Sequence, residues 1–85
     1  MSHGLEFPCA YPVKVMVRSG SAARAEVLSV VAAHAHYSRA DDVRTRASRN
    51  GRFESITITV QAQSREQLER LYQALGDLNV VKMLL

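Results

Sequence analysis

Arginines gather in one part of the sequence, where their side chains could bind phosphate or carboxylate groups. Nine of the 11 basic residues are arginine, and one alternating segment with the turn after it carries four of them: Arg44, Arg46, Arg49 and Arg52. A guanidinium group offers a rigid fork of donors that fits phosphate or carboxylate oxygens. The cluster is therefore a candidate patch for anions or nucleic acid. A solvated strand edge is the alternative interpretation, because charged side chains discourage pairing between sheet edges.

A second candidate is the loop Ser19-Gly20-Ser21, which separates an alternating segment from an alanine-rich one. Free N–H groups at the start of a helix can hold a carboxylate or a phosphate, so a small acidic ligand could bind here. A serine hydroxyl at this place could equally cap the helix by accepting one of those N–H groups. The same three residues thus allow a ligand loop or an ordinary capped turn.

The other reactive side chains predict neither a metal site nor a catalytic site. His34 and His36 are two positions apart, which directs them to different sides of a helix and does not suit a shared metal. Cys9 is the single cysteine and has no neighbouring base in the sequence. Asp41-Asp42 shows no feature that would separate the two carboxyl pKa values. We therefore expect no catalytic residues, no cofactor and no bound metal.

Length and composition indicate one small globular domain. The chain has 85 residues, of which 47% are hydrophobic and 22% charged, a balance typical of folded proteins. The net charge of +3 is modest for a protein that binds nucleic acid. The longest apolar run is far too short to cross a membrane, and the start lacks the pattern of a secretory leader. With a single cysteine, these features predict a reduced, cytoplasmic protein.

Hydrophobic periodicity predicts four strands and two helices. The strands are expected over residues 13–18, 43–48, 53–63 and 80–84, and the helices over 22–36 and 64–76. Ser64 and Gln67 have the spacing of a capping box, and Gly76 fits the C-terminal cap of the second helix. Asn50-Gly51 predicts a type I′ hairpin turn.

The order β-α-β-β-α-β predicts a ferredoxin-like sandwich, an α+β fold in which a four-stranded antiparallel sheet carries both helices on one face. Residues 1–11 form an N-terminal arm in this interpretation, and residues 12–85 form the single domain. The arginine-rich strand becomes an edge, and the other face of the sheet stays uncovered. The side chains expected on the uncovered face are Lys14, Met16, Arg18, Ser55, Thr57, Thr59, Val80, Lys82 and Leu84. Mixed patches of this kind often lie under a partner.

Short motifs spread from Leu5 to Leu85 follow the order and spacing of a known family. They are Leu5-Glu6-Phe7-Pro8, Lys14-Val15-Met16, His34-Ala35, Asn50-Gly51, Ser55-Ile56-Thr57-Ile58, Glu66-Gln67, Leu71-Tyr72, Leu75-Gly76 and Val81-Lys82-Met83-Leu84-Leu85. With them the chain resembles the YbeD-like family of small bacterial proteins of unknown function.

The resemblance implies a sandwich similar to the regulatory ACT domains of amino-acid enzymes, which bind small ligands near the loop that matches Ser19-Gly20-Ser21. It also implies a regulatory link to lipoate metabolism, because genes of the family often lie near lipoate-attachment genes. It supplies no catalytic residues.

We therefore expect a non-catalytic regulatory or adaptor domain. Its partner would be another protein, a second copy of the chain or a small acidic metabolite, bound at the open face, the arginine edge or the first loop. The alternative function is a nucleic-acid-binding module that uses the four clustered arginines. Nucleic acid is the less favoured partner, because RNA recognition by this fold needs aromatic side chains on the open face and only Phe53 qualifies. No contact with a membrane is expected.

Overall fold

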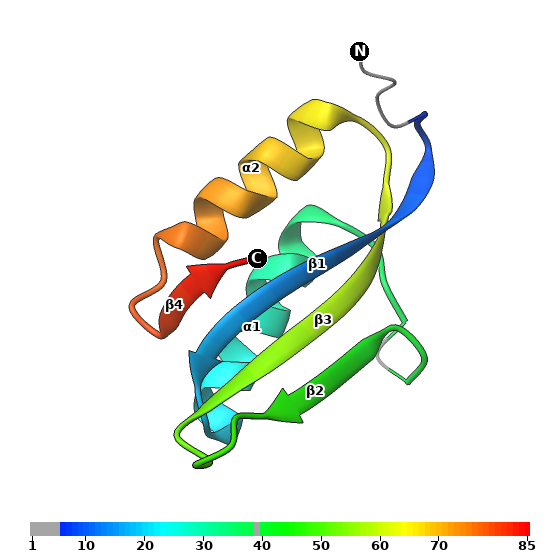
Figure 1. Ribbon diagram of the computed structural model, residues 1–85. Helices are drawn as coiled ribbons and strands as arrows, with labels where there is room; N and C mark the ends of the chain where they lie inside the picture. Colours follow the sequence, from blue (N-terminus) through cyan, green and yellow to red (C-terminus); the bar gives the residue numbers. More distant parts are fainter. Residues whose placement is uncertain (1–5, 39) are drawn as a thin grey trace.

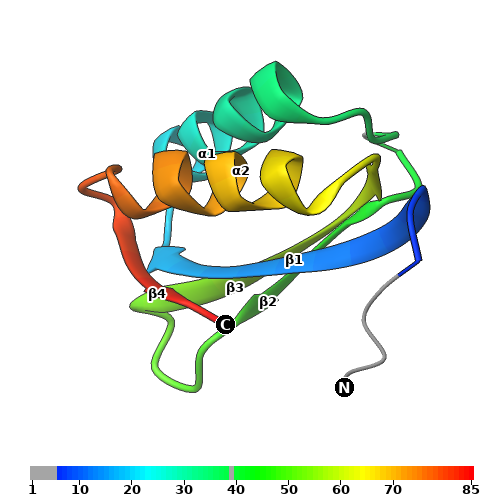
Figure 2. The same ribbon diagram turned by 90° about the horizontal axis from the view of Figure 1, so that it is seen from above.

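The computed structural model describes residues 6–38 and 40–85, and it has the predicted order of elements (Figure 1). The strands are β1 (Cys9–Arg18), β2 (Val43–Ala47), β3 (Phe53–Ala62) and β4 (Val81–Leu84), and the helices are α1 (Ser21–His34) and α2 (Arg65–Gly76). The strands pair antiparallel in the order β2-β3-β1-β4. Figure 2 shows both helices on one face of this sheet. The ferredoxin-like fold is thus confirmed, with the arginine-rich β2 at an edge.

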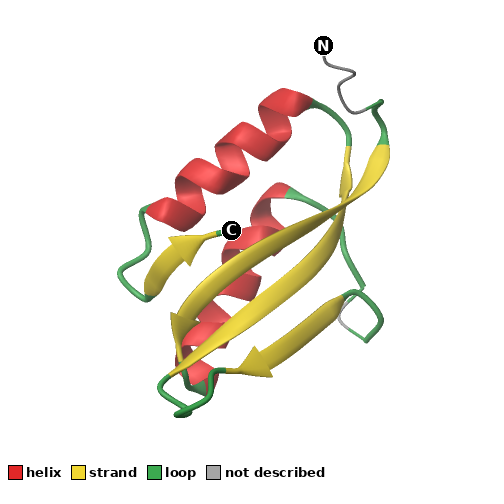
Figure 3. Ribbon diagram, viewed as in Figure 1, coloured by secondary structure: helices red, strands yellow, loops and turns green. Residues whose placement is uncertain are grey.

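The core lies between the sheet and the two helices. The long central strands β1 and β3 cross the middle of Figure 3. Alternate residues are buried from Val13 to Val17 in β1 and from Glu54 to Ala62 in β3. The fully buried strand residues are Val13, Val15, Val17, Ile56, Ile58, Val60 and Ala62. The helices cover them with Ala23, Val27, Leu28, Val31, Leu68, Leu71 and Leu75. Because side chains alternate along a strand, this core fixes which residues must face away from the helices.

The first helix is shorter than predicted. It ends at His34, and Ala35 has an extended backbone with φ −155°. The His36 carbonyl then accepts a hydrogen bond of 2.9 Å from the backbone N–H of Gln61 in β3. The chain leaves the helix early because this pairing requires an extended segment, so the helix ends between the two histidines.

The start and the end of α2 follow the prediction, but Gly76 is not the predicted glycine cap. The Ser64 hydroxyl accepts from the Gln67 N–H at 3.1 Å, which confirms the predicted N-cap. The Gln67 side chain also donates to the His34 carbonyl at 2.9 Å, which joins the two helices. Gly76 lies inside the last turn without a positive φ, and Asp77 is the C-cap.

The hairpin between β2 and β3 is longer than the predicted type I′ turn. Among the described residues other than glycine, none has a positive φ, so Asn50 cannot occupy the first central position of that turn. The Gly51 N–H instead donates to the Ser48 carbonyl at 3.0 Å, and Gly51 itself has φ 75°. The Asn50 side chain accepts from the Arg52 N–H at 3.0 Å. This side-chain bond stabilises a turn in which only glycine is left-handed.

The first strand begins earlier in the sequence than the predicted residue 13. β1 begins at Cys9, where Cys9 pairs with Ala62 and Tyr11 with Val60, because β3 is long enough to offer partners. Residues 1–5 of the expected arm lie outside the described residues. The Lys14 carbonyl accepts from the Leu85 N–H, so the even-numbered residues of β1 direct their backbone groups toward β4. Pro12 is tolerated because β4 does not extend that far and no N–H is needed there.

The last strand does not alternate as predicted. Leu84 pairs with Val15, Met83 with Met16 and Val81 with Val17, and a register shift falls between the last two pairs. Residues paired across a sheet point to the same face. Leu84, which pairs with the buried Val15, therefore packs against the core and not on the open face, whereas Met83 is exposed there. Val80 also packs against the core, contrary to the prediction. The irregular step explains the error, because it breaks the period of two on which the prediction relied.

Candidate functional site

The face of the sheet opposite the helices carries basic side chains in rows that run across the strands. We call this surface the basic face and define it by residues Lys14, Met16, Arg18, Arg44, Arg46, Ser55, Thr57, Thr59 and Met83. In one row, Thr57 of β3 lies between Lys14 of β1 and Arg44 of β2. Neighbouring strands are about 4.8 Å apart, so these two cationic residues stand about 10 Å from each other.

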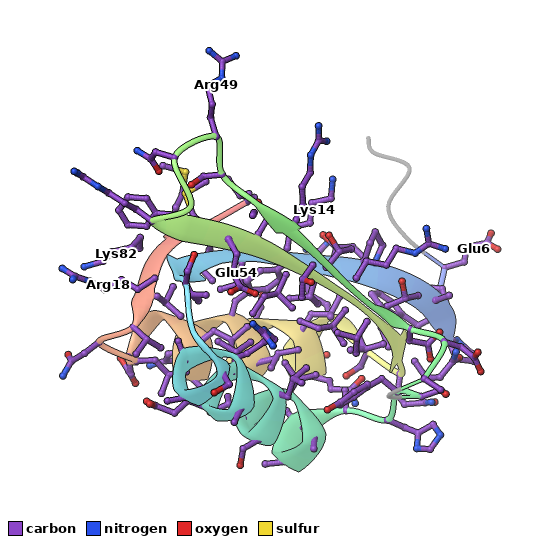
Figure 4. All side chains as sticks on the ribbon, turned by 90° about the horizontal axis from the view of Figure 1, so that it is seen from below. Glu6, Lys14, Arg18, Arg49, Glu54 and Lys82 are labelled. Atoms are coloured by element: carbon purple, nitrogen blue, oxygen red, sulfur yellow. The ribbon has the colours of Figure 1, made fainter. Side chains whose placement is uncertain are left out.

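The second row holds Arg46, Ser55, Met16 and Met83, one from each strand. Met83 is 52% exposed and is one of two large apolar side chains that are exposed in the described part of the chain. Figure 4 shows Lys14 projecting from the side of the sheet that faces away from the helices, as does Arg49 in the hairpin. The basic face thus combines apolar thioethers with cations around them.

No described carboxylate forms an ion pair with the cations of this face. The four strands contain one acidic residue, Glu54, and its side chain is buried on the helix side. Within residues 6–38 and 40–85, the only ion pair is that between Glu54 and Arg24. Lys14, Arg44 and Arg46 therefore have no carboxylate partner. Cations about 10 Å apart are separated by about one screening length at 0.1 M salt, so their potentials overlap at low ionic strength and are increasingly screened as salt rises.

The structure brings three of the four predicted arginines together. Arg44 and Arg46 line a shallow hollow with Lys14, and Arg46 and Arg49 line a neighbouring one with Met16. Arg52 instead lines a third hollow, with Arg18 and Ser19.

The one aromatic residue expected on this surface is Phe53. It lines the hollow that holds Arg46 and Arg49, and it is half-buried. The described strands therefore place a single aromatic side chain at this end of the basic face. Stacking platforms for nucleic-acid bases normally present several.

In the loop Ser19-Gly20-Ser21, a backbone N–H group donates a hydrogen bond to the carboxylate of Glu54. Gly20 is the N-cap of α1 with φ 141°, and no side chain caps the helix, so the predicted serine cap is wrong. The Gly20 N–H donates to Glu54 Oε1 at 3.3 Å. Glu54 thus stands where an acidic ligand would compete with it, and binding of a ligand at this loop stays a prediction.

Glu54 is the residue that sequence reasoning missed. Its Oε2 lies 2.9 Å from Nε of Arg24 in α1, and its side chain is 7% exposed. The hydrogen bond from Arg24 and the Gly20 N–H lower the pKa of Glu54, against the opposing effect of burial. The carboxylate therefore stays ionised at neutral pH. The sequence did contain a signal for this contact. Glu54 stands two residues before Ile56 and so shares its buried side of the strand, where an acidic side chain needs a partner.

Tyr72 and Asp42 are two further polar residues whose surroundings the structure defines. Burial, together with the neighbouring Tyr11 hydroxyl, raises the pKa of Tyr72 to about 12, far from the neutral range that proton transfer needs. Asp42 accepts from the Ser38 N–H at 2.7 Å and so stabilises a loop. Residues 6–38 and 40–85 hold no group of three or more His, Cys, Asp or Glu side chains placed for a metal ion. No helix in these ranges is long and apolar enough to span a membrane.

Comparisons with known proteins match nearly the whole chain. The chain is 44% identical over 81 residues to UPF0250 protein NE1487 of Nitrosomonas europaea, with 95% of this chain and 93% of the relative covered. It is 39% identical over 80 residues to a UPF0250 protein of Paraburkholderia phytofirmans, with 94% and 90% covered.

A solved structure supports the fold. The solution structure of protein HP0495 from H. pylori superposes with a TM-score of 0.76 at 15% identity and covers 99% of this chain and 88% of that one. The model of a family described as "Protein of unknown function (DUF493)" matches residues 2–85. The chain therefore belongs to this DUF493 family, whose UPF0250 members are the YbeD-like proteins that its sequence resembles.

Proposed function

We propose that this protein is a non-catalytic adaptor or regulatory domain that binds an acidic surface of a partner protein on its basic face. The observation that carries the proposal is the set of cations at outward positions of β1 and β2, none of which has a carboxylate partner. An acidic partner would neutralise Lys14, Arg44 and Arg46 without breaking any contact within the chain. Such complementarity speeds association and excludes wrong partners.

The methionines support a protein partner over a free anion. Met16 and Met83 lie side by side at the end of the second row, next to the cations. Flexible thioether side chains adapt to varied apolar surfaces and recur at protein-binding sites. A small metabolite would use the cations alone, so a need for both methionines distinguishes the two kinds of partner.

The regulatory role, the ACT-like behaviour and the link to lipoate metabolism belong to this proposal. The same is true of a cytoplasmic location, which is supported by the single, unpaired Cys9. A regulatory domain of this kind acts by burying surface on its partner, and nothing in its own chain needs to react.

Paired charge reversals test the proposed function. The double variant Lys14→Glu/Arg46→Glu reverses two exposed cations on the basic face, and the control Arg65→Glu/Arg70→Glu reverses two exposed cations on α2. Both variants change the net charge equally. Immobilised wild type and variants are used to capture proteins from a bacterial extract, with and without nuclease treatment. The variant Met16→Ser/Met83→Ser tests the contribution of the two exposed thioethers.

The proposal predicts an acidic protein that is retained by wild type and by the α2 variant, and reduced about tenfold by the variant of the basic face. Equal losses in the two double variants would show that net charge alone acts, and this would refute a specific site. Capture that disappears after nuclease treatment would assign the arginines to nucleic acid. Capture that is independent of both methionines would favour a small acidic group as the recognised feature.

A further inference from the structure

The outer edge of β2 exposes backbone groups that the sheet does not use. At its two ends, the Thr59 N–H donates to the Asp42 carbonyl at 2.9 Å and the Ser48 N–H donates to the Phe53 carbonyl at 2.7 Å. In an antiparallel ladder, hydrogen-bonded and non-bonded pairs alternate. The backbone N–H and C=O groups of Arg44 and Arg46 therefore bond to β3. Those of Val43, Thr45 and Ala47 point away from the sheet.

This edge is accessible along most of its length. Every residue of β2 after Val43 is exposed. The free part of β1 beyond β4 differs, because Pro12 stands there without an N–H group. Proline at an edge prevents strand pairing with any partner. The exposed arginines of β2 discourage pairing with a like-charged strand, but they do not oppose an acidic one. Unlike this part of β1, the edge strand β2 can therefore accept an added strand.

We infer that β2 binds an extended acidic segment of the partner protein as a fifth strand of the sheet. The N–H and C=O groups of Thr45 and Ala47 would complete the ladder with that segment. Side chains of an added strand alternate between the faces. Its acidic residues would lie beside Arg44 and Arg46, and its small or apolar residues would lie beside Thr45 and Ala47. The inference rests on the proposed function, since it specifies the form of the acidic partner.

A second copy of the chain fits this edge poorly. Symmetric antiparallel pairing of two β2 strands about Thr45 would place Arg44 of each copy opposite Arg46 of the other. Like charges directly opposite each other destabilise a sheet. An acidic strand replaces both repulsions by attractions, so charge complementarity selects a different chain as the occupant.

Peptide binding followed by NMR tests the inference. The probe is a blocked peptide of about seven residues that alternates glutamate with valine, and its control replaces every glutamate by lysine. The readouts are the dissociation constant and the hydrogen-exchange rates of the Thr45 and Ala47 amides. We expect the acidic peptide to bind about tenfold tighter than the control. It should also slow exchange at both amides, which lack acceptors in the free chain.

A proline variant separates the edge from the basic face. Thr45→Pro removes an outward N–H without touching the bonds to β3, and Thr45→Val keeps that N–H. We expect the proline to weaken peptide binding about tenfold and the valine to leave it unchanged. If Thr45→Pro does not fold, Ala47→Pro removes the next outward N–H and replaces it.

The outcomes keep the two proposals apart. Shifts confined to Lys14, Met16 and Thr57, with unchanged exchange at Thr45 and Ala47, would refute strand addition while the proposed basic-face function stands. Equal binding of the acidic and lysine peptides would refute the charge preference. The absence of any shift would refute the edge site, whereas the capture experiment decides the function separately.

Discussion

The Glu54 carboxylate of β3 lies 2.9 Å from the Arg24 guanidinium of α1 and also accepts the Gly20 N–H at the helix start. This pair joins the sheet to the first turn of the helix that covers it. It also keeps the one acidic side chain of the strands on the helix side, so the strands place no carboxylate on the opposite face. Side chains alternate between the two faces along β3. This alternation places Glu54 beside Arg24 on the helix side and leaves uncharged residues between the cations on the opposite face.

Removing the Glu54 carboxylate should destabilise the fold. In Glu54→Ala, the Gly20 N–H loses its acceptor, while Arg24 is exposed enough to turn to water. We expect a loss of about 1–2 kcal/mol in the free energy of unfolding, measured by urea denaturation. The control Arg24→Leu/Glu54→Leu replaces both charges by apolar groups and should cost less than the single change. A single variant as stable as wild type would show that the pair contributes nothing.

The same pair predicts a dependence of stability on pH. Because the folded pKa of Glu54 is below its ordinary value of 4.5, the stabilisation is complete above that value and is lost as pH falls through the folded pKa. We expect the difference in unfolding free energy between wild type and Glu54→Gln to be smaller at about pH 3 than at about pH 7. Other carboxyl groups cancel in this difference. A difference that is independent of pH would argue against the shift.

Two glycines should respond in opposite ways to alanine. Gly20 has φ 141°, a region closed to side chains, so Gly20→Ala should cost about 1–3 kcal/mol despite open space around it. Gly76 is helical, and an added Cβ would lie 3.7 Å from Leu84 Cδ1, an ordinary contact. Gly76→Ala should therefore stabilise by about 0.5–1 kcal/mol. Thermal unfolding of the two variants checks the contrast, which fails if both shift in the same direction.

Substitutions at inward-facing and outward-facing positions of neighbouring strands should have very different effects on stability. Ile58 of β3 is fully buried, so Ile58→Asp would bury a charge without a partner at a cost of several kcal/mol and should unfold the chain. Arg46 of β2 is exposed, and Arg46→Glu should change stability by less than about 0.5 kcal/mol. Circular dichroism and thermal melting measure both. Equal damage by the two changes would contradict the assignment of faces.

The sequence was sufficient for the strand order and for the faces of the central strands. Alternation of β-branched residues around Ile56 and Ile58 places one side of β3 in the core, and the capping box at Ser64 marks the start of α2. These features were predictable because they depend on local spacing alone.

The features that the sequence did not reveal depend on contacts between distant segments. The end of α1 is set by the pairing of His36 with Gln61, and the orientation of Leu84 by an irregular step against β1. The carboxylate that accepts the Gly20 N–H at the start of α1 belongs to Glu54, which lies 34 residues from Gly20. A rule based on periodicity cannot include such contacts. The outward positions of the basic residues were therefore predictable from the sequence, whereas the contact of Glu54 with Gly20 was not.

Solvent access to the methionine methyl groups tests most directly whether the basic face is uncovered and positive. Paramagnetic gadolinium chelates of negative and of zero charge would be added to the protein, and the relaxation of the Met16 and Met83 methyl signals would be compared with that of the buried Val60. We expect both methionines to relax faster than Val60 with either chelate, and faster still with the anionic one. Methionine methyl groups as protected as those of Val60, or no preference for the anion, would contradict an open, positively charged face.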